Sequence, residues 1–411
     1  MNLVKSAALA TAIAFVSTAG ASAETLKIAF IDPLSGPFGP SGQAGLSEWN
    51  YAAAQMNAKG GIGGKDVEII GLDNKINPKE SLVQLQKALD QGVRFIAQGN
   101  GSSVASALID AIAKHNKRNP GEEVLFLNYA AVDPAFTNDR CNFWHFRFDA
   151  DAHMKMEAVT DWVQSQDAIK KIYVIGQDYS FGKAVSAAAV KNLGEKRPDI
   201  EIVGNELHPL GKVKDFTPYV QKIISSGADA VITGNWGADM VLLIKAAIDS
   251  GYDGPILTYY GGSKGAATAM GAAAVGQVKA IVEHNTNLPM HDAQATYVDG
   301  YQAAYPDEDY YYHRIHNAMN MLAKAADKAG STEPKDVAFA LEGMTYESST
   351  GTVTMRADNH QILQPMFMST FSDNVGRGVE DLPLGWTSGP ADRIEAEATA
   401  TETTCKMKRP S

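Results

Sequence analysis

Leu26-Lys-Ile-Ala-Phe-Ile31 is a short, mostly apolar run that predicts a buried β-strand. A helical pattern follows over residues 45–59, and a second strand pattern, Asp66-Val-Glu-Ile-Ile-Gly-Leu72, comes after it. The alternation continues with a helix over 78–91, a strand over 95–98, a helix over 104–114 and a strand over 124–127. Short strands that alternate with longer helices are typical of a parallel sheet with crossover helices. The first third of the chain therefore predicts one doubly wound α/β unit.

The same alternation begins again after residue 152. It predicts strands over 171–175, 200–206, 228–233 and 256–259, separated by helices over 181–193, 216–226 and 240–250. The remaining segments, which complete units already begun, are a strand over 278–283, helices over 292–305, 310–328 and 334–341, and strands over 352–355 and 364–371. Two similar units predict two doubly wound parallel-sheet lobes with a cleft between them, where the strands' carboxyl ends bind ligands.

The first 23 residues have the pattern of a cleavable signal peptide. Lys5 precedes an apolar run over 7–16, and Ala21-Ser-Ala23 stands just before Glu24, which predicts cleavage after Ala23. No later apolar run reaches the ~18 uncharged residues that a membrane span needs, so we expect an exported protein that is not inserted in a membrane. The formal net charge of −11 becomes more negative when Lys5 is removed. This acidity and the lack of a basic run argue against a nucleic-acid partner.

Cys141 and Cys405 are the two cysteines of the chain. An even number of cysteines in an exported protein favours a disulfide, because the compartment is oxidising. Two free thiols are the alternative. A bridge would fasten the last segment, 374–411, which has few apolar residues and which we interpret as a surface tail.

Ile28-Ala-Phe-Ile-Asp-Pro-Leu-Ser-Gly-Pro37 is the first of several segments that share one resemblance. The others are 42–49, Asn57-Ala-Lys-Gly-Gly-Ile-Gly-Gly-Lys65, Asp73-Asn-Lys-Ile-Asn-Pro78, 99–103, 138–147 and 176–182. Together they resemble the leucine/isoleucine/valine-type periplasmic binding proteins of bacterial ABC importers, and among these the members that bind aromatic acids. The resemblance covers nearly all of residues 24–411.

The resemblance implies three crossover hinge strands between the lobes, near 147–149, 282–284 and 360–363. It gives an N-terminal lobe of residues 24–147 plus 284–360, a C-terminal lobe of 148–283 plus 361–373, and the tail 374–411. It also implies a periplasmic monomer without a cofactor that delivers its ligand to a permease and its ATPase. Closure around such hinges lets a membrane partner distinguish the ligand-bound state.

The loop Asn100-Gly-Ser-Ser103 follows a predicted strand and begins a predicted helix. Free N–H groups and the partial positive charge of a helix N-terminus can hold a carboxylate there. A serine in this position is also a common helix cap, so the residues alone leave both interpretations open. The resemblance assigns the carboxylate contact to Ser102, with Ser103 and Asn100 beside it.

A second loop, at Ala130 and Val132, resembles the family segment that gives an amino-acid ligand a backbone carbonyl and a threonine hydroxyl. Val132 stands where the hydroxyl would be, and Tyr260 stands where the family has an acidic residue for the ligand ammonium. A buried ammonium without a carboxylate costs several kcal/mol. We therefore expect a ligand without an α-amino group.

Aromatic residues in predicted strand-to-helix loops replace the missing polar groups. Aromatic faces stack on a flat ring, which makes an aromatic carboxylate the expected ligand and a branched-chain amino acid the alternative. Core packing is the competing interpretation, most strongly for Phe181. The predicted contacts are Tyr179, Phe181, Trp236 and Tyr260, with Asp178 and Asn235 for a ring hydroxyl. Arg147 is predicted to brace a crossing against Asp149 or Asp151 rather than to bind ligand.

Other chemistry has little support in the sequence. The glycine run 60–64 precedes a strand, whereas a dinucleotide fingerprint follows one. His313 and His316 lack the H-E-x-x-H arrangement, so no metal site is expected. No Ser, His and Asp set can be tied together by the sequence, which argues against an exported hydrolase. A sensor that passes its closed state to a receptor is the alternative function of another class.

Overall fold

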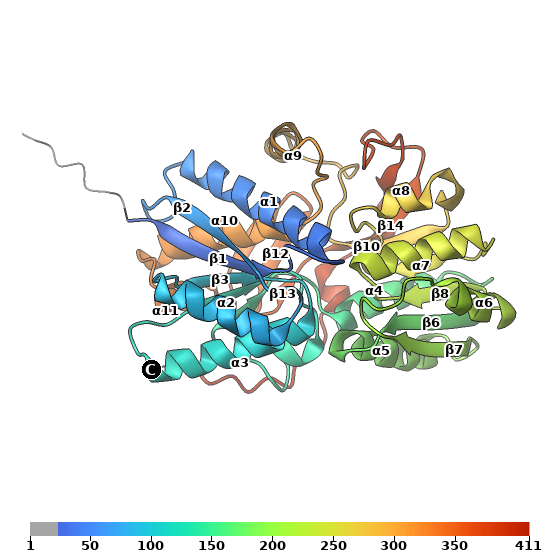
Figure 1. The fold of residues 1–411 in the computed structure, drawn as a ribbon, viewed down its shortest axis with the longest axis horizontal. Coiled ribbons are helices and arrows are strands. Elements are labelled where there is room, and N and C mark those ends of the chain that lie inside the picture. Colours follow the sequence, from blue (N-terminus) through green and yellow to red (C-terminus); the bar gives the residue numbers. More distant parts are fainter. Residues whose placement is uncertain (1–23, 411) are drawn as a thin grey trace, which may run out of the picture.

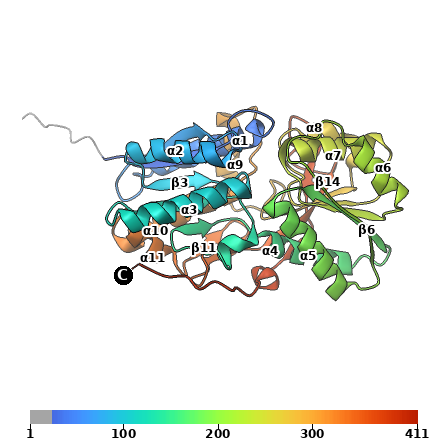
Figure 2. The ribbon, with the colours of Figure 1, turned by 60° about the horizontal axis from the view of Figure 1, so that its bottom comes forward.

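The computed structural model describes residues 24–410, and the predicted signal peptide lies outside the described residues. Two large sheets with helices on both faces lie next to each other along the longest axis of the molecule (Figure 1). Segments from the first and last thirds of the chain gather around one sheet, and the middle of the chain forms most of the other (Figure 2). The predicted two-lobed α/β fold is confirmed.

The first sheet is wholly parallel, with the strand order β2-β1-β3-β4-β5. Its strands are β1 (Leu26–Asp32), β2 (Val67–Asp73), β3 (Phe95–Gln98), β4 (Leu125–Asn128) and β5 (His145–Arg147). One face is covered by α1 (Gly39–Asn57), α10 (His313–Ala329) and α11 (Pro334–Leu341), and the other by α2 (Pro78–Asp90) and α3 (Ser102–Arg118).

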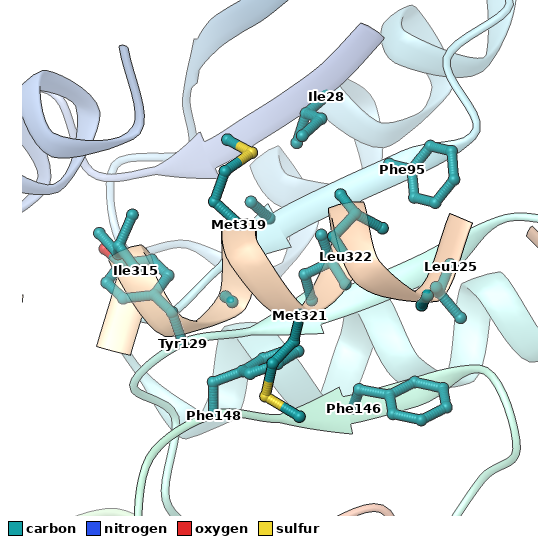
Figure 3. Packing of buried hydrophobic residues seen from close by; sticks show 14 of the residues in the cluster. Ile28, Phe95, Leu125, Tyr129, Phe146, Phe148, Ile315, Met319, Met321 and Leu322 are labelled. Carbon is teal, nitrogen blue, oxygen red and sulfur yellow. The ribbon is translucent and has the colours of Figure 1, made fainter. Parts of the chain in front are cut away.

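Alternation along β1 explains why both faces need helices. Ile28 and Phe30 are buried against α1 and α10, whereas Ala29 and Ile31 are buried against α2 and α3. Figure 3 shows the α10 face, where Met319 and Leu322 lie over strands of the sheet. The apolar stripe of α10 therefore joins this late segment to a sheet whose strands all precede residue 148.

The second sheet has the order β15-β14-β10-β9-β8-β6-β7, with β16 also paired to β14. The strands from β10 to β7 run parallel, and β14 runs antiparallel to β10. Its strands are β6 (Lys171–Gln177), β7 (Glu201–His208), β8 (Ala230–Thr233), β9 (Ile256–Thr258), β10 (Val278–Val282), β14 (Met366–Ser372), β15 (Gly385–Thr387) and β16 (Arg393–Ile394). Helices α4 (Ala152–Gln164) and α5 (Ser180–Lys196) cover one face, and α6 (Thr217–Ser225), α7 (Gly237–Asp249) and α8 (Ala266–Met270) the other.

The chain passes between the two sheets at three places near the predicted crossings. The first lies between β5 and α4, and the second follows β10 and leads to α9 (Asp292–Ala304). The third follows β13 (Ile362–Leu363), which belongs to a small antiparallel sheet with β11 (Thr345–Ser348) and β12 (Gly351–Met355).

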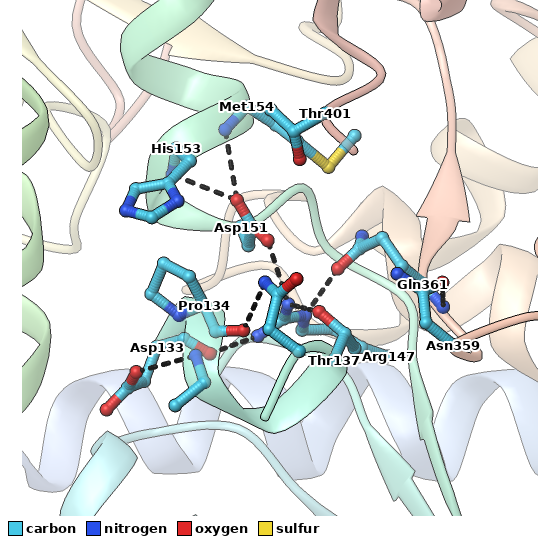
Figure 4. A network of polar contacts seen from close by, with 12 residues as sticks. Asp133, Pro134, Thr137, Arg147, Asp151, His153, Met154, Asn359, Gln361 and Thr401 are labelled. Carbon is cyan, nitrogen blue, oxygen red and sulfur yellow. Dashed lines mark hydrogen bonds and ion pairs between the residues drawn. The ribbon is translucent and has the colours of Figure 1, made fainter. Parts of the chain in front are cut away.

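Arg147 braces the first crossing against the third, as the sequence predicts (Figure 4). Its Nε donates to Gln361 Oε1 at 2.6 Å, and Nη2 donates to Asp151 Oδ2 at 3.1 Å. Nη1 donates to the carbonyl of Asp133 at 2.6 Å, and Nη2 also contacts Thr137. Because these contacts occupy the buried guanidinium, Arg147 is a structural residue.

Two expectations need correction. Helix α4 was not expected, although Asp151 caps it by accepting from the N–H groups of His153 and Met154. The segment predicted as a surface tail supplies β15 and β16 to the second sheet, where Phe371 is paired with Trp386. The predicted disulfide between Cys141 and Cys405 is present and holds the end of this segment beside the first sheet.

Candidate functional site

A cavity lies between the two sheets. Its walls come from the N-termini of α1 and α3, from the loops after β3, β4, β8 and β9, and from the start of α5 and α10. These loops follow the carboxyl ends of parallel strands, which is where open α/β sheets place their ligands. The lining residues are Ser41, Gly99, Asn100, Gly101, Ser102, Ala130, Val132, Phe181, Trp236, Tyr260, Ser263, Tyr311, Tyr312 and Arg314.

Ser102 is the first residue of α3, and it is buried with 2% of its surface exposed. The N–H groups of Val104 and Ala105 donate to the carbonyl of Gly101, whereas Ser102 makes no side-chain hydrogen bond within residues 24–410. Gly101 has φ of 91°, a conformation that favours glycine. The hydroxyl and the first amides of α3 are therefore available to an anion at the cavity wall.

Asp32, at the end of β1, shapes the loop that holds Ser102. Its carboxylate accepts from the N–H of Gly99 at 3.2 Å, from the N–H of Asn100 at 3.0 Å and from the Tyr129 hydroxyl at 2.5 Å. Burial raises the pKa of Asp32 to about 7, although these hydrogen bonds oppose the shift. Asn100 Nδ2 also donates to Asp32, at 3.1 Å, so this side chain supports the loop while the residue lines the cavity.

Arg314, the second residue of α10, is the charged side chain of the cavity lining and was not predicted from the sequence. Its Nη1 donates to Glu283 Oε1 at 2.5 Å, and Nε lies 3.6 Å from Asp149 Oδ2. Nε and Nη2 are buried and have no hydrogen-bond partner in the described part of the chain. Buried N–H groups are normally satisfied, so Arg314 is equipped to bind an acceptor in the cavity.

The carboxylates around Arg314 are already paired. Lys155 Nζ lies 2.9 Å from Asp149 Oδ1, and the Tyr260 hydroxyl donates to Asp149 Oδ2 at 3.2 Å. Burial raises the pKa of Glu283, but Arg314 and then Lys155 outweigh this effect and hold it below its ordinary value. Asp149 and Glu283 therefore neutralise Lys155 and Arg314, and among the cavity-lining residues there is no Asp or Glu.

Aromatic side chains form the walls around this charged set. Trp236, from the second sheet, packs on Phe38, which precedes α1, with ring centroids 4.3 Å apart. The ring centroids of Phe181 and Tyr260, on the same side of the cavity as Trp236, lie 6.1 Å apart. Contacts between the two sheets' loops therefore enclose the cavity in this arrangement.

Tyr311 and Tyr312 come from the segment before α10, and Glu48 of α1 positions both. Glu48 Oε1 accepts from the N–H groups of Tyr311 and Tyr312, at 2.8 and 2.7 Å. Burial raises the pKa of Glu48 to about 8, while the same hydrogen bonds lower it. Tyr311 and Tyr312 thus form cavity walls and also pack against the core of the first sheet.

The structure separates the predicted contacts into two groups. Residues that line the cavity are Asn100, Ser102, Ala130, Val132, Phe181, Trp236 and Tyr260. Ser103, Asp178, Tyr179 and Asn235 do not line it.

Each of these four side chains has another environment. Ser103 is exposed on α3, and Asp178 is half exposed and lies 3.2 Å from Lys183 Nζ. Asn235 is buried, and its Oδ1 lies 3.1 Å from Nε2 of His208. Tyr179 lies behind Trp236 and accepts from its Nε1 at 2.8 Å. We therefore remove them from the candidate lining.

Ser41, Ser263, Tyr311 and Arg314 line the cavity without having been predicted as contacts. The sequence offers a weak signal for Ser263, which follows the predicted contact Tyr260 in one loop. It offers none for Arg314, because only the packing of α10 on the first sheet brings this residue to the cleft.

Within residues 24–410, no group of acidic, histidine or cysteine side chains has the arrangement of a metal site. The helices of this part of the chain also include none that is long and apolar enough to cross a membrane.

Comparisons with known proteins agree with this architecture. A family model described as a periplasmic binding protein matches residues 25–375. Leu/Ile/Val-binding protein homolog 4 of Brucella abortus (strain 2308) is 30% identical over 406 residues, which cover 97% of this chain and 96% of that one.

Solved structures give the same result. The closed leucine-, isoleucine-, valine-, threonine-, and alanine-binding protein from Brucella ovis is 28% identical, with a TM-score of 0.83 over 94% of this chain and 100% of that one. A Rhodopseudomonas palustris solute binding protein in complex with benzoate is 18% identical and shares the fold, with a TM-score of 0.77 over 93% of this chain and 99% of that one. The chain therefore belongs to the periplasmic binding protein family, as a binding protein rather than an enzyme.

Proposed function

We propose that the protein captures a small aromatic carboxylate between its lobes and delivers it, as a periplasmic monomer cleaved after Ala23, to a permease with its ATPase. The observation that carries the proposal is the composition of the cavity lining. Ser102 and Arg314 offer unpaired donors, aromatic rings form much of the wall, and no acidic residue is among the lining residues.

The carboxylate part of the proposal rests on donors that lack acceptors. Ser102 provides a hydroxyl at a helix N-terminus, and Arg314 provides Nη2, which is buried and has no hydrogen-bond partner in the described residues. Hydrogen bonds to a charged group contribute about 1.5–3 kcal/mol each. A ligand carboxylate would satisfy both residues.

The proposal that the ligand is aromatic rests on two features of the cavity. Aromatic side chains line it, and its lining has no acidic residue that could pair with a ligand ammonium. Phe181, Trp236 and Tyr260 offer ring faces and edges, and aromatic pairs add about 0.5–1.5 kcal/mol beyond burial. An α-ammonium would need an acidic partner, but Asp149 and Glu283 lie outside the lining and are paired with Lys155 and Arg314. A ring is therefore favoured over an amino acid.

A branched-chain amino acid is the second candidate. The relatives that are 28% and 30% identical are named for binding leucine, isoleucine and valine or for homology to such proteins. Asp149 supports this alternative through its position, since Tyr260 of the cavity wall donates to it. An ammonium that displaced the Tyr260 hydroxyl would reach this carboxylate.

A thermal-shift panel distinguishes the two ligands. We expect benzoate and its hydroxylated derivatives to raise the melting temperature, because a ligand at 100 times its Kd stabilises the folded state by about 2.7 kcal/mol. Leucine, isoleucine and valine serve as the competing set, and acetate controls for a bare carboxylate. If the branched-chain amino acids raise the melting temperature and the aromatic acids do not, the aromatic assignment is wrong.

Ser102→Ala is expected to weaken binding of the acid by about 10- to 100-fold, which corresponds to the loss of one hydrogen bond to a charged group. Isothermal titration calorimetry gives the Kd. Ser103→Ala is the matched control, since Ser103 follows Ser102 in α3 and lies outside the cavity. Equal affinities of the Ser102→Ala variant and the wild type would exclude Ser102 from the carboxylate contact.

A further inference from the structure

A second cavity lies on the other side of Tyr311. Its walls come from the loop after β9, the second crossing, the segment before α10 and the loop between β14 and β15. Tyr311 lines both cavities, and Gly262 of the second cavity lies in the same loop as Tyr260 and Ser263 of the first. The two spaces are therefore neighbours that share one side chain.

Tyr311 and Gly262 together form the partition. A Cβ at Gly262 would lie 2.9 Å from Tyr311 Cε2, which is too close for two carbon atoms, so the ring packs directly on the glycine backbone. Gly262 does not have a positive φ, so its backbone conformation does not require glycine. The contact with the Tyr311 ring is the reason that a side chain does not fit here.

The second cavity contains a buried polar side chain without a partner. His284 is 7% exposed and stacks on His313 at 4.4 Å, but its Nε2 has no hydrogen-bond partner in the described residues. Burial lowers the pKa of His284 to about 3, so the ring is neutral and carries one donor and one acceptor nitrogen. A ligand group that hydrogen-bonds to His284 would satisfy it.

The charges around this cavity restrict the kind of ligand group. Asp309 and Glu380 both line it. The Asp309 carboxylate accepts from the N–H of Glu380 at 3.0 Å, and Glu380 accepts from the N–H groups of Gly265 and Thr268 at 2.5 and 2.7 Å. A second ligand carboxylate would be repelled by these acids, whereas a neutral hydroxyl would not.

We propose that the second cavity is a subsite that the Tyr311 ring separates from the first: Tyr311 limits ligand length, and removal or displacement of its ring lets His284 bind the distal hydroxyl of a longer ligand. The inference rests on the proposed function only in taking the first cavity as the site of the ligand's charged end.

The test measures Kd by calorimetry for the mature wild type and Tyr311→Ala against two ligand series. The acids are benzoate, 3-phenylpropanoate and 3-(4-hydroxyphenyl)propanoate, and the amino acids are leucine, phenylalanine and tyrosine. We expect Tyr311→Ala to raise the affinity for the longest hydroxylated member, relative to the shortest member of the same series, by at least about 10-fold. The dicarboxylate 3-(4-carboxyphenyl)propanoate is the control and should not gain, because of Asp309 and Glu380.

A second comparison isolates the hydroxyl. In the Tyr311→Ala background the hydroxylated ligand should bind more tightly than its phenyl analogue, and His284→Leu should abolish this preference. The comparison of the hydroxylated ligand with its phenyl analogue needs only the Tyr311→Ala variant. It is therefore valid even if the variant that combines Tyr311→Ala with His284→Leu does not fold.

The outcomes separate the two proposals. If the amino-acid series binds and gains length tolerance, the aromatic-acid proposal fails and the subsite is supported. The subsite is overturned if a series binds but Tyr311→Ala does not change the affinity of its longest member relative to its shortest. It is also overturned if the hydroxylated ligand binds no more tightly than its phenyl analogue. If neither series binds, both proposals are overturned.

Discussion

Arg314→Gln is expected to lower the affinity for the carboxylate ligand by about 100-fold, since hydrogen bonds to charged groups contribute about 1.5–3 kcal/mol each. Nη2 of Arg314 is a buried donor without a hydrogen-bond partner in residues 24–410, and the residue lines the cavity. The same change should lower the free energy of unfolding by about 3–5 kcal/mol, because removing one member of a buried ion pair leaves an unpaired charge. Here that charge is Glu283, whose Oε1 lies 2.5 Å from Arg314 Nη1.

Arg314→Lys separates the two effects. Lysine keeps the positive charge beside Glu283 and Asp149 but lacks the planar fork that binds two acceptors at once. We expect most of the stability to return while binding of the acid stays weak. Calorimetry measures the affinity and urea denaturation the stability. Wild-type affinity in a folded Arg314→Gln variant would show that Arg314 serves only the buried charge set.

Replacing Cys141 and Cys405 together with serine is expected to lower the free energy of unfolding by about 3–5 kcal/mol. The bridge spans 264 residues of sequence, and a cross-link that closes so long a loop strongly restricts the unfolded chain. Urea denaturation of the double variant and of the wild type gives the difference.

Wild-type protein in a reducing agent is the control for this experiment and should unfold at the midpoint of the double variant. The variant should keep its Kd for the ligand, because neither cysteine lines the cavity. An unchanged midpoint in the double variant would mean that the contacts of the last segment, such as the bond from Thr403 Oγ1 to the carbonyl of Thr137 at 2.8 Å, hold it without the bridge.

The sequence was sufficient for the parallel strands β1–β4 and β6–β10 and for the loops that border the cleft. Ser102 and Tyr260 each follow a strand within a regular strand-loop-helix series, so strand direction alone places them at the cleft. The same rule fails for Asp178, because a loop position does not determine where a side chain points: Asp178 extends outward to Lys183.

The contacts that the late segments of the chain make with the two sheets could not be predicted from the sequence. Arg314 reaches the cavity only because the apolar stripe of α10 packs on the first sheet, and no local pattern indicates which sheet the helix covers. Strands β15 and β16 are three and two residues long, too short for an alternating pattern to show. Their pairing with β14 depends on tertiary position rather than on local preference.

The last segment of the chain forms a further covalent connection between the two halves of the molecule. After β16 the chain leaves the second sheet and runs back to the first, where Cys405 is joined to Cys141 (Figure 2). The two halves are thus connected by four covalent links, which are the three chain crossings and the last segment with its disulfide. Reduction of the disulfide breaks the fourth link. Reduction of the bridge should therefore widen the range of relative orientations while leaving the three continuous crossings intact.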